Sequence, residues 1–323
     1  MAELLQIEQT MFPKAHKEAY RRLCEQRDDI PLFLQAWWLD AVTEPDNKQW
    51  QVLLSTNKKG EIEGALPFVF GKKFGMYFAV TPQLTQYTGI WQRKPDMNIQ
   101  KDLIRQLEAL HLSFFEVRFM PEYTNWLPFY WSGYKQQTRY TYRIEDTSDL
   151  QNVISGFDSA KKKHLKHIES NGLQADFTMS AEDFYELQCL QLKGRKDTNV
   201  LSNQLVTHLV QTARKRDSGE IICIKDREGN INAASFVVWD NRSAYNLITA
   251  IHPDFRSSGA STMMIMEALK ICNIRHLAWD FEGSMIENVE HNNRQFGAVQ
   301  QPYFEIFKYS PMIQFAQLFM KVK

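Results

Sequence analysis

The chain has 323 residues, of which 44% are hydrophobic and 24% are charged, and its 38 basic and 38 acidic residues cancel. These values are typical of a globular protein long enough to form two domains. They exclude a protein that holds nucleic acid through overall positive charge, because such a protein carries a surplus of Lys and Arg.

The ends of the chain and its cysteines bear on compartment and metal content. The first 20 residues lack a basic segment followed by an apolar one, so no secretory signal is predicted, and no apolar stretch is long enough to span a membrane. The four cysteines lie far apart without a CxxC pair, which favours reduced thiols and no metal site. We therefore expect a cytoplasmic protein. The apolar, terminally basic segment 310–323 fits either packing on the second domain or peripheral contact with a membrane.

Two segments of the chain repeat one pattern. Residues 52–70 and residues 221–239 each contain a β-rich run, a charged turn that ends in Gly, and a second β-rich run. Gly60 and Gly229 occupy equivalent turn positions, where a tight hairpin favours a positive φ. A helical segment precedes each hairpin and a strand-like segment follows it, which predicts two similar α+β domains in tandem. The alternative is two unrelated hairpins.

The boundary between the domains is predicted near residues 134–150. The segment is strand-like through Ile144, and Thr147 or Ser148 then provides the N-cap of one helix that runs to Gly172. We therefore assign residues 1–140 to the first domain and residues 141–323 to the second.

The predicted helix before Gly172 carries a basic cluster. Ile154, Phe157, Leu165 and Ile168 form its buried stripe, as their helical spacing indicates. The cluster consists of Lys161, Lys162, Lys163 and Lys166. Two interpretations fit these cations: a cradle for phosphate groups and a solvated helix face.

A strand, a loop and a helix follow one another between residues 250 and 271. The free backbone N–H groups and the dipole at such a helix start attract an anion, and Gly259 permits close approach of the backbone. The predicted binding residues are Arg256, Ser257, Ser258, Gly259, Ala260 and Ser261. The alternative is a capped helix start with an incidental Arg.

The segment 276–282 predicts a strand with two carboxylates at its carboxyl end. The period of two residues places Asp280 and Glu282 on the same side, at the strand end where ligand clefts of α/β folds open. Because like charges repel, one of the two carboxyl groups retains its proton more readily, and either one suits a general base. The alternative is that Asp280 accepts hydrogen bonds from loop backbone and that Glu282 faces water. A short helix then ends at Gly297, with Arg294 in its last turn, suited to the helix dipole or to an anionic ligand.

Several of these motifs resemble the Fem-type branch of the GNAT (Gcn5-related N-acetyltransferase) superfamily. They are "SAKKKHLKHIESNGL", "DFYELQCLQLKGR", "GNINAASFVVW", "AYNLITAIHPDFRSSGAST" and "WDFEGSMIENVEHNNRQFGAVQQPYFEIFKY", and together they cover residues 135–309. The first half follows through "FLQAWWLDAV", "GALPFVFGKKFG" and "TPQLTQYTGIW". The resemblance implies two tandem GNAT-like domains, each a mixed and mostly antiparallel sheet flanked by helices.

The resemblance also implies a reaction class. Fem-type proteins transfer amino acids from aminoacyl-tRNA to a cell-wall precursor, whereas ordinary GNAT enzymes bind acyl-CoA through a (Q/R)xxGx(G/A) motif. Residues 256–261 look like that motif, with Ser261 in the position of the last Gly or Ala. In the Fem pattern FKxxFG the Lys position is Asn293, and the nearby cation is Arg294. Asn293 and the neutral net charge disfavour a tRNA donor.

The sequence therefore predicts an N-acyltransferase. An acyl-CoA or aminoacyl ester donor would bind the loop 256–261, and Glu282, Asp280 or a water that they hold would deprotonate an amine, for example of a cell-envelope precursor. Transfer would be direct, without a covalent enzyme intermediate. The predicted substrate-binding residues are Lys162, Lys163, Lys166, Arg294 and Tyr245. The alternative function is an inactive pair of GNAT domains that binds a phosphorylated envelope precursor or glycan.

Overall fold

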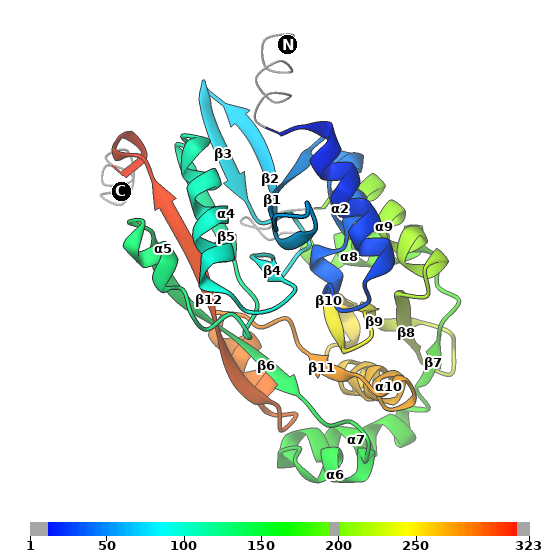
Figure 1. Cartoon of the computed structure of the whole chain (residues 1–323). Coiled ribbons are helices and arrows are strands. Elements are labelled where there is room, and N and C mark those ends of the chain that lie inside the picture. Colours follow the sequence, from blue (N-terminus) through cyan, green and yellow to red (C-terminus); the bar gives the residue numbers. More distant parts are fainter. Residues whose placement is uncertain (1–11, 194–200, 315–323) are drawn as a thin grey trace. The chain divides into compact units, whose positions relative to one another are not determined.

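The computed structural model describes residues 12–193 and 201–314 (Figure 1). Its contacts divide into two compact units: residues 12–139 together with 302–314, and Tyr140–Gln301. The boundary lies inside two strands, β6 (Lys135–Ile144) and β12 (Val299–Tyr309), each of which begins in one unit and ends in the other. The sequence had assigned everything after residue 140 to the second domain, whereas in this division residues 302–314 return to the first unit.

Among its described residues, the first unit places two helices before a hairpin and two helices after it. Its elements are α2 (Lys14–Gln26), the 3₁₀ turns η1 (Leu32–Leu34) and η2 (Glu44–Asp46), α3 (Ala36–Thr43), β1 (Gln49–Thr56), β2 (Ile62–Lys73), β3 (Met76–Val80), β4 (Trp91–Gln92), α4 (Met97–Ala109), β5 (Phe114–Arg118) and α5 (Leu127–Trp131). The strands are ordered β1-β2-β3-β5-β12, and β4 pairs with β2. All pairs are antiparallel except β3 with β5.

The described part of the second unit also has two helices directly before a hairpin and two helices after it. Its elements are α6 (Leu150–Ser155), α7 (Ser159–Asn171), β7 (Gln174–Asp176), α8 (Ala181–Leu192), α9 (Asn203–Lys215), β8 (Gly219–Lys225), β9 (Ile231–Trp239), β10 (Ser243–Ile251), the 3₁₀ turn η3 (Pro253–Phe255), α10 (Ala260–Arg275), β11 (Ala278–Asp280) and α11 (Glu287–Arg294). The strands are ordered β6-β11-β10-β9-β8-β7, with β10 and β11 parallel and the other pairs antiparallel. The α+β prediction with a mixed, mostly antiparallel sheet is confirmed for both units.

The two predicted hairpins are present and are built alike. In β1–β2 the Gly60 amide donates to the Asn57 carbonyl, and in β8–β9 the Gly229 amide donates to the Asp226 carbonyl. Both glycines have a positive φ, 81° and 84°, as the turn requires. The repeat in the sequence is therefore a repeat in structure.

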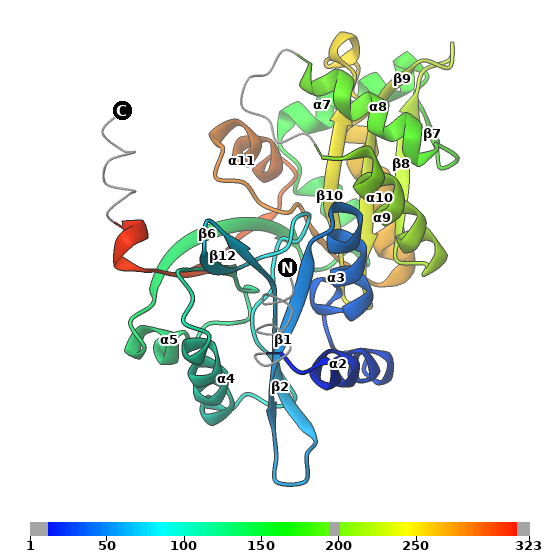
Figure 2. The same cartoon turned by 90° about the horizontal axis from the view of Figure 1, so that it is seen from above.

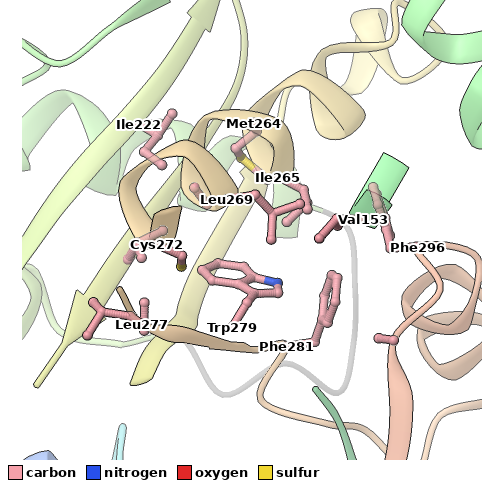
Figure 3. Close-up of a cluster of buried hydrophobic side chains, with 14 of the residues drawn as sticks. Val153, Ile222, Met264, Ile265, Leu269, Cys272, Leu277, Trp279, Phe281 and Phe296 are labelled. Atoms are coloured by element: carbon pink, nitrogen blue, oxygen red, sulfur yellow. The ribbon is translucent and has the colours of Figure 1, made fainter. Parts of the chain in front are cut away.

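The core of the second unit lies between its sheet and the helix α10. Met264, Ile265, Leu269 and Cys272 point from α10 onto the buried ring of Trp279 in β11 (Figure 3). Helix α8 contacts β10 and helix α9 contacts β8; Figure 1 shows them on the face of this sheet opposite α10, and Figure 2 shows the same helices from above. Leu205, Leu209 and Ala213, spaced at helical intervals along α9, are fully buried there.

The predicted single helix before Gly172 is instead two helices. Helix α6 ends at Ser155 and α7 starts at Ser159, because Gly156 packs against Gly297: a Cβ atom on Gly297 would lie 2.7 Å from the Gly156 carbonyl oxygen. The N-cap is Asp149, whose carboxylate accepts from the amides of Gln151 and Asn152, and not Thr147 or Ser148. The helix end at Gly172, with φ of 60°, is confirmed, as is the burial of Phe157.

The C-terminal segment was predicted to pack on the second domain or on a membrane. Residues 315–323 lie outside the described residues. At the start of the segment the Ser310 amide donates to the Ser113 carbonyl of the first unit at 2.8 Å, so this part of the packing prediction is wrong. Within the described ranges, no helix is sufficiently long and apolar to cross a bilayer.

Candidate functional site

The sheet of the second unit opens between its two parallel strands. Strands β10 and β11 pair over three residues only, from Ser243 with Ala278 to Tyr245 with Asp280. Strand β10 then continues to Ile251 without β11 beside it, and its pairing with β9 is shifted by a bulge between Asn246 and Ile248. Bulges of this kind redirect strands near active sites. The opening lies at the carboxyl ends of both strands, where α/β folds bind ligands.

The chain leaves β10 through η3 and enters α10 through the predicted anion loop. Gly259 is the N-cap of α10 with φ of 90°, a conformation that glycine adopts without a steric cost. The Ser258 hydroxyl accepts from the Ala260 amide at 3.3 Å, while the amides of Gly259 and Ser261 donate no hydrogen bond among the described residues. No acidic residue lies in the first turn of α10. Unused amides and the helix dipole therefore face the loop without a carboxylate to occupy them.

The loop 256–261 has an exposed cation, and helix α7 holds its buried end in place. Arg256 and Ser257 are exposed, whereas Gly259 and Ala260 are buried. Helix α7 holds the loop: the Asn171 side chain donates to the Ser258 carbonyl at 2.9 Å, and the His164 ring lies 3.2 Å from the Thr262 hydroxyl. The structure thus brings all six predicted loop residues together at one helix start.

Asp280 is the last residue of β11 and has no exposed surface. Its Oδ1 accepts from the Thr141 hydroxyl at 2.6 Å and from the Glu282 amide at 2.8 Å, and the Arg143 guanidinium lies 4.0 Å from its Oδ2. A side chain without exposed surface cannot receive a proton directly from a bound amine. The geometry supports the alternative reading, in which Asp280 anchors the loop that follows it.

Glu282 does not share a strand face with Asp280. Strand β11 ends at Asp280, and Glu282 has a φ of 53°, so the predicted alternation stops two residues early. Gly283 follows, and its amide donates to the Thr141 hydroxyl at 2.9 Å. A Cβ atom on Gly283 would lie 2.0 Å from the Tyr140 carbonyl oxygen, so only glycine fits there. Glu282 is half-buried on this tightly held loop, beside the strand opening.

The basic cluster on α7 divides into three parts. Lys161 is only 3% exposed: its ammonium donates to the Asn292 side chain at 2.6 Å and lies 4.4 Å from the centre of the Phe296 ring. Burial lowers the pKa of Lys161 below its usual value. Lys162 donates to the Ser155 carbonyl at 2.7 Å. Lys163 and Lys166 are exposed, which is compatible with either a phosphate contact or a solvated face.

The other predicted substrate-binding residues differ in accessibility. Arg294 is exposed on α11, where its guanidinium donates to Glu290 at 3.0 Å. Tyr245 is buried opposite Asp280, and burial holds the pKa of its hydroxyl well above the usual value. Asn293, at the Lys position of the Fem pattern, is also buried.

The residues Phe296 and Gly297 form a structural corner. Phe296 stacks edge-on against Phe157 with ring centres 5.2 Å apart, and the Asp158 amide donates to the Gln295 carbonyl at 2.9 Å. Gly297 has φ of 71° and closes the turn after α11. This corner joins the start of α7 to the end of α11, so the motif has a packing role here.

Sequence reasoning missed the residues that set the end of β11. Thr141 and Arg143 lie on the buried face of β6, and Arg143 also donates to the Ser243 hydroxyl at 3.0 Å. The alternation of Arg139, Thr141 and Arg143 with apolar residues was the available signal. It also missed a cavity of about 670 Å³ between α8 and η3, with an acidic lining that includes Asp183, Glu186 and Asp254. Among the residues that the structure describes, no group of His, Cys, Asp and Glu is arranged to hold a metal ion.

A protein-family model matches the part of the second unit that contains the loop 256–261 and α10. Residues 161–279 match the family model described as an acetyltransferase (GNAT) domain, a range that contains the loop and α10 and stops before Asp280, the last residue of β11. No curated protein matches the sequence.

Three solved structures share the fold at low sequence identity. FemX has a TM-score of 0.68 at 9% identity, over 89% of this chain and 95% of its own. The C-terminal domain of a putative lysylphosphatidylglycerol synthetase from Agrobacterium fabrum has a TM-score of 0.60 at 11% identity, over 95% of this chain and 96% of its own. A tandem GNAT protein from the clavulanic acid biosynthesis pathway has a TM-score of 0.53 at 11% identity, over 90% of this chain and 92% of its own. Residues 161–279 of the second unit are therefore similar to a GNAT domain, and the chain shares its fold with these three structures.

Proposed function

We propose that the protein is an N-acyltransferase whose donor site is the loop 256–261 of the second unit. The observation that carries the proposal is the helix start of α10, where the amides of Gly259 and Ser261 are unused and Arg256 is exposed beside them. Backbone amides at a helix start bind phosphate groups well, and an arginine adds a charged, two-pronged donor. A donor that carries a diphosphate, as acyl-CoA does, fits this arrangement.

The strand opening provides the place for the acyl group. Beyond Tyr245 and Asp280 strands β10 and β11 no longer pair with each other, and we place the acyl group against the edge of β10 that β11 leaves uncovered there. Glu282 lies on the loop that leaves this opening and is the group that we assign as general base, directly or through a water. Asp280 is assigned a positioning role, since its carboxylate holds the Glu282 amide.

The reaction then needs no covalent enzyme intermediate. The loop holds the donor through its phosphates, and the amine nitrogen forms a C–N bond to the donor carbonyl carbon. The C–S or C–O bond of the donor breaks, Glu282 takes the proton of the amine, and the leaving thiolate or alkoxide takes a proton from Glu282 or from water. Proton transfer of this kind contributes about 10²–10⁴-fold to the rate. The likeness to FemX and to a putative lysylphosphatidylglycerol synthetase favours an acceptor amine from the cell envelope. An aminoacyl-tRNA donor is less favoured because Asn293 replaces the Lys of the Fem pattern.

The test is isothermal titration of the protein with acetyl-CoA, with CoA and with a charged tRNA, followed by turnover assays on amine panels. We expect binding of acetyl-CoA and CoA that Arg256→Ala weakens. Turnover that Glu282→Gln lowers by about 10²-fold or more would support the general base. Binding without turnover of any donor, unaffected by Glu282→Gln, would identify an inactive binding module instead. The absence of heat with all three ligands would overturn the proposal.

A further inference from the structure

We propose that the tip of the β2–β3 hairpin in the first unit is a peripheral membrane anchor for an anionic phospholipid surface. The tip consists of Lys72, Lys73 and Phe74, and it is independent of the donor site. Figure 1 shows this hairpin in cyan at the top, ending beyond the helix α4 of the same unit.

The tip exposes an aromatic ring that the fold does not use. Phe74 is 86% exposed, the largest value among the exposed large hydrophobic residues of the described chain. It also has a φ of 51°, in a two-residue turn with Gly75 at 79°. Such turns favour Asn, Asp or Gly at the first position, and a bulky residue there is conformationally costly. Phe74 therefore gains neither packing nor a favourable backbone from its position, so its ring is available to an external apolar phase.

The charged residues next to Phe74 in the sequence are all basic. Lys72 and Lys73 are exposed, and no acidic residue occurs between Glu63 and Asp96 in the sequence. The ammonium of Lys73 lies 5.5 Å from the Phe74 ring centre, and that of Lys72 lies 4.9 Å from the Tyr77 ring centre. Cations beside an exposed aromatic ring match the interface of an anionic bilayer, where the ring enters the headgroup region and the ammonium groups meet phosphates.

The hairpin beneath the tip is rigid enough to present it. Phe70 and Tyr77 stack across the two strands with ring centres 5.6 Å apart. Gly71 lets the Phe78 ring lie flat on the opposite strand, since a Cβ atom at Gly71 would lie 2.4 Å from that ring. A narrow, preorganised tip without a groove suits insertion into a fluid interface better than docking on a folded protein, which requires a broad complementary surface.

The same unit contains a matched control hairpin. The β1–β2 turn also carries two exposed lysines, Lys58 and Lys59, but it has no aromatic residue at its tip. Its charges are offset, because the Asn57 side chain holds Glu61 at 2.7 Å and Glu63 at 3.3 Å beside the turn. Equal charge changes in the two turns therefore separate a specific anchor from a general effect of net charge.

The experiment is co-sedimentation of the full chain with sucrose-loaded vesicles of phosphatidylcholine alone or mixed with phosphatidylglycerol. We expect the wild type to bind the mixed vesicles at least about tenfold more strongly, and the binding to weaken with salt. Lys72→Glu with Lys73→Glu should lower binding by at least about tenfold, and Phe74→Ser by about fivefold or more. Lys58→Glu with Lys59→Glu should change it by less than about threefold.

Three results would overturn the anchor: no preference of the wild type for anionic vesicles, equal losses in the two double variants, or full binding by Phe74→Ser. All substituted positions are exposed, and circular dichroism spectra of the variants verify their folding. The readout needs no acyl donor, so it is independent of the outcome of the titrations with acetyl-CoA.

Discussion

The two units contain the same strand–loop–helix arrangement and end it differently. In the first unit the chain passes from β3 to α4, and the Asp96 carboxylate caps the helix by accepting from the Asn98 amide at 2.7 Å. In the second unit the chain passes from β10 to α10, whose N-cap Gly259 has no side chain, and the Ala260 amide donates to the neutral hydroxyl of the preceding Ser258 at 3.3 Å. One helix start carries its own anion, and the other offers its amides and Arg256 to an external one.

The parallel strand pairs beside these helices also differ between the two units. In the first unit, β3 and β5 pair in parallel, and the chain after β3 stays on β5: the Thr81 amide donates to the Glu116 carbonyl, and the Thr88 amide to the Arg118 carbonyl. In the second unit, β10 and β11 separate after Tyr245 and Asp280. The first unit has filled its opening with its own chain, whereas the second unit keeps it. This contrast is the reason that we place the proposed donor site in the second unit.

The largest expected effect concerns the carboxylate that keeps the second opening in shape. Asp280→Ala removes the acceptor for the Thr141 hydroxyl and for the Glu282 amide, and it leaves the buried Arg143 guanidinium without its neighbouring carboxylate. We therefore expect a loss of about 2–4 kcal/mol in the free energy of unfolding in urea. Asp280→Asn retains an acceptor oxygen and should lose clearly less. Unchanged stability in Asp280→Ala would mean that the anchoring role is wrong.

The next effect comes from making the second unit resemble the first. Ser258→Asp places a carboxylate at the start of α10, as Asp96 does for α4, and should weaken acetyl-CoA binding in titration by about tenfold or more. The fold should be unaffected, because residue 258 precedes the N-cap Gly259 and is only half-buried. Ser258→Asn, which is similar in size but uncharged, is the control and should bind nearly as well as the wild type. Equal affinity in the Asp variant would place the donor elsewhere.

Arg256 tests the charged part of the same site. Arg256→Ala should weaken acetyl-CoA binding by about three- to tenfold and make the remaining affinity less dependent on salt. Lys270→Ala removes an exposed cation from the other end of α10 and serves as the control. A similar loss in both variants would indicate a general effect of net charge.

The smallest effect is expected from removing the carboxylate cap of α4 in the first unit. Asp96→Ala removes the cap of α4 and should lower the free energy of unfolding by about 1 kcal/mol, while acetyl-CoA affinity stays at the wild-type value. Asp96→Ser, which retains a capping oxygen, should restore most of the stability. Any gain of a second binding event in the Ala variant would show that the first opening is less filled than its contacts indicate.

Local patterns in the sequence predicted the hairpin turns and the loop and helix start of the candidate site. The turn glycines Gly60 and Gly229, the loop that ends at Gly259, and the start of α10 were all identified, because each depends on backbone preferences within a few residues. The sequence did not predict that Glu282 and Asp280 lie on different faces, because this depends on where β11 ends. That end is set by Thr141, which is 139 residues from Asp280 in the sequence.

By itself, the sequence determined the repeat, the α+β class and the order strand, loop and helix at residues 250–271, since these follow from periodicity and turn chemistry. Only the tertiary structure decided that Asp280 is buried as an anchor, that Lys161 is buried against Asn292 and Phe296, and that residues 302–314 return to the first unit. The physical reason is that burial and hydrogen-bond partners belong to pairs of segments far apart in the chain, whereas capping and turn preferences belong to a few consecutive residues.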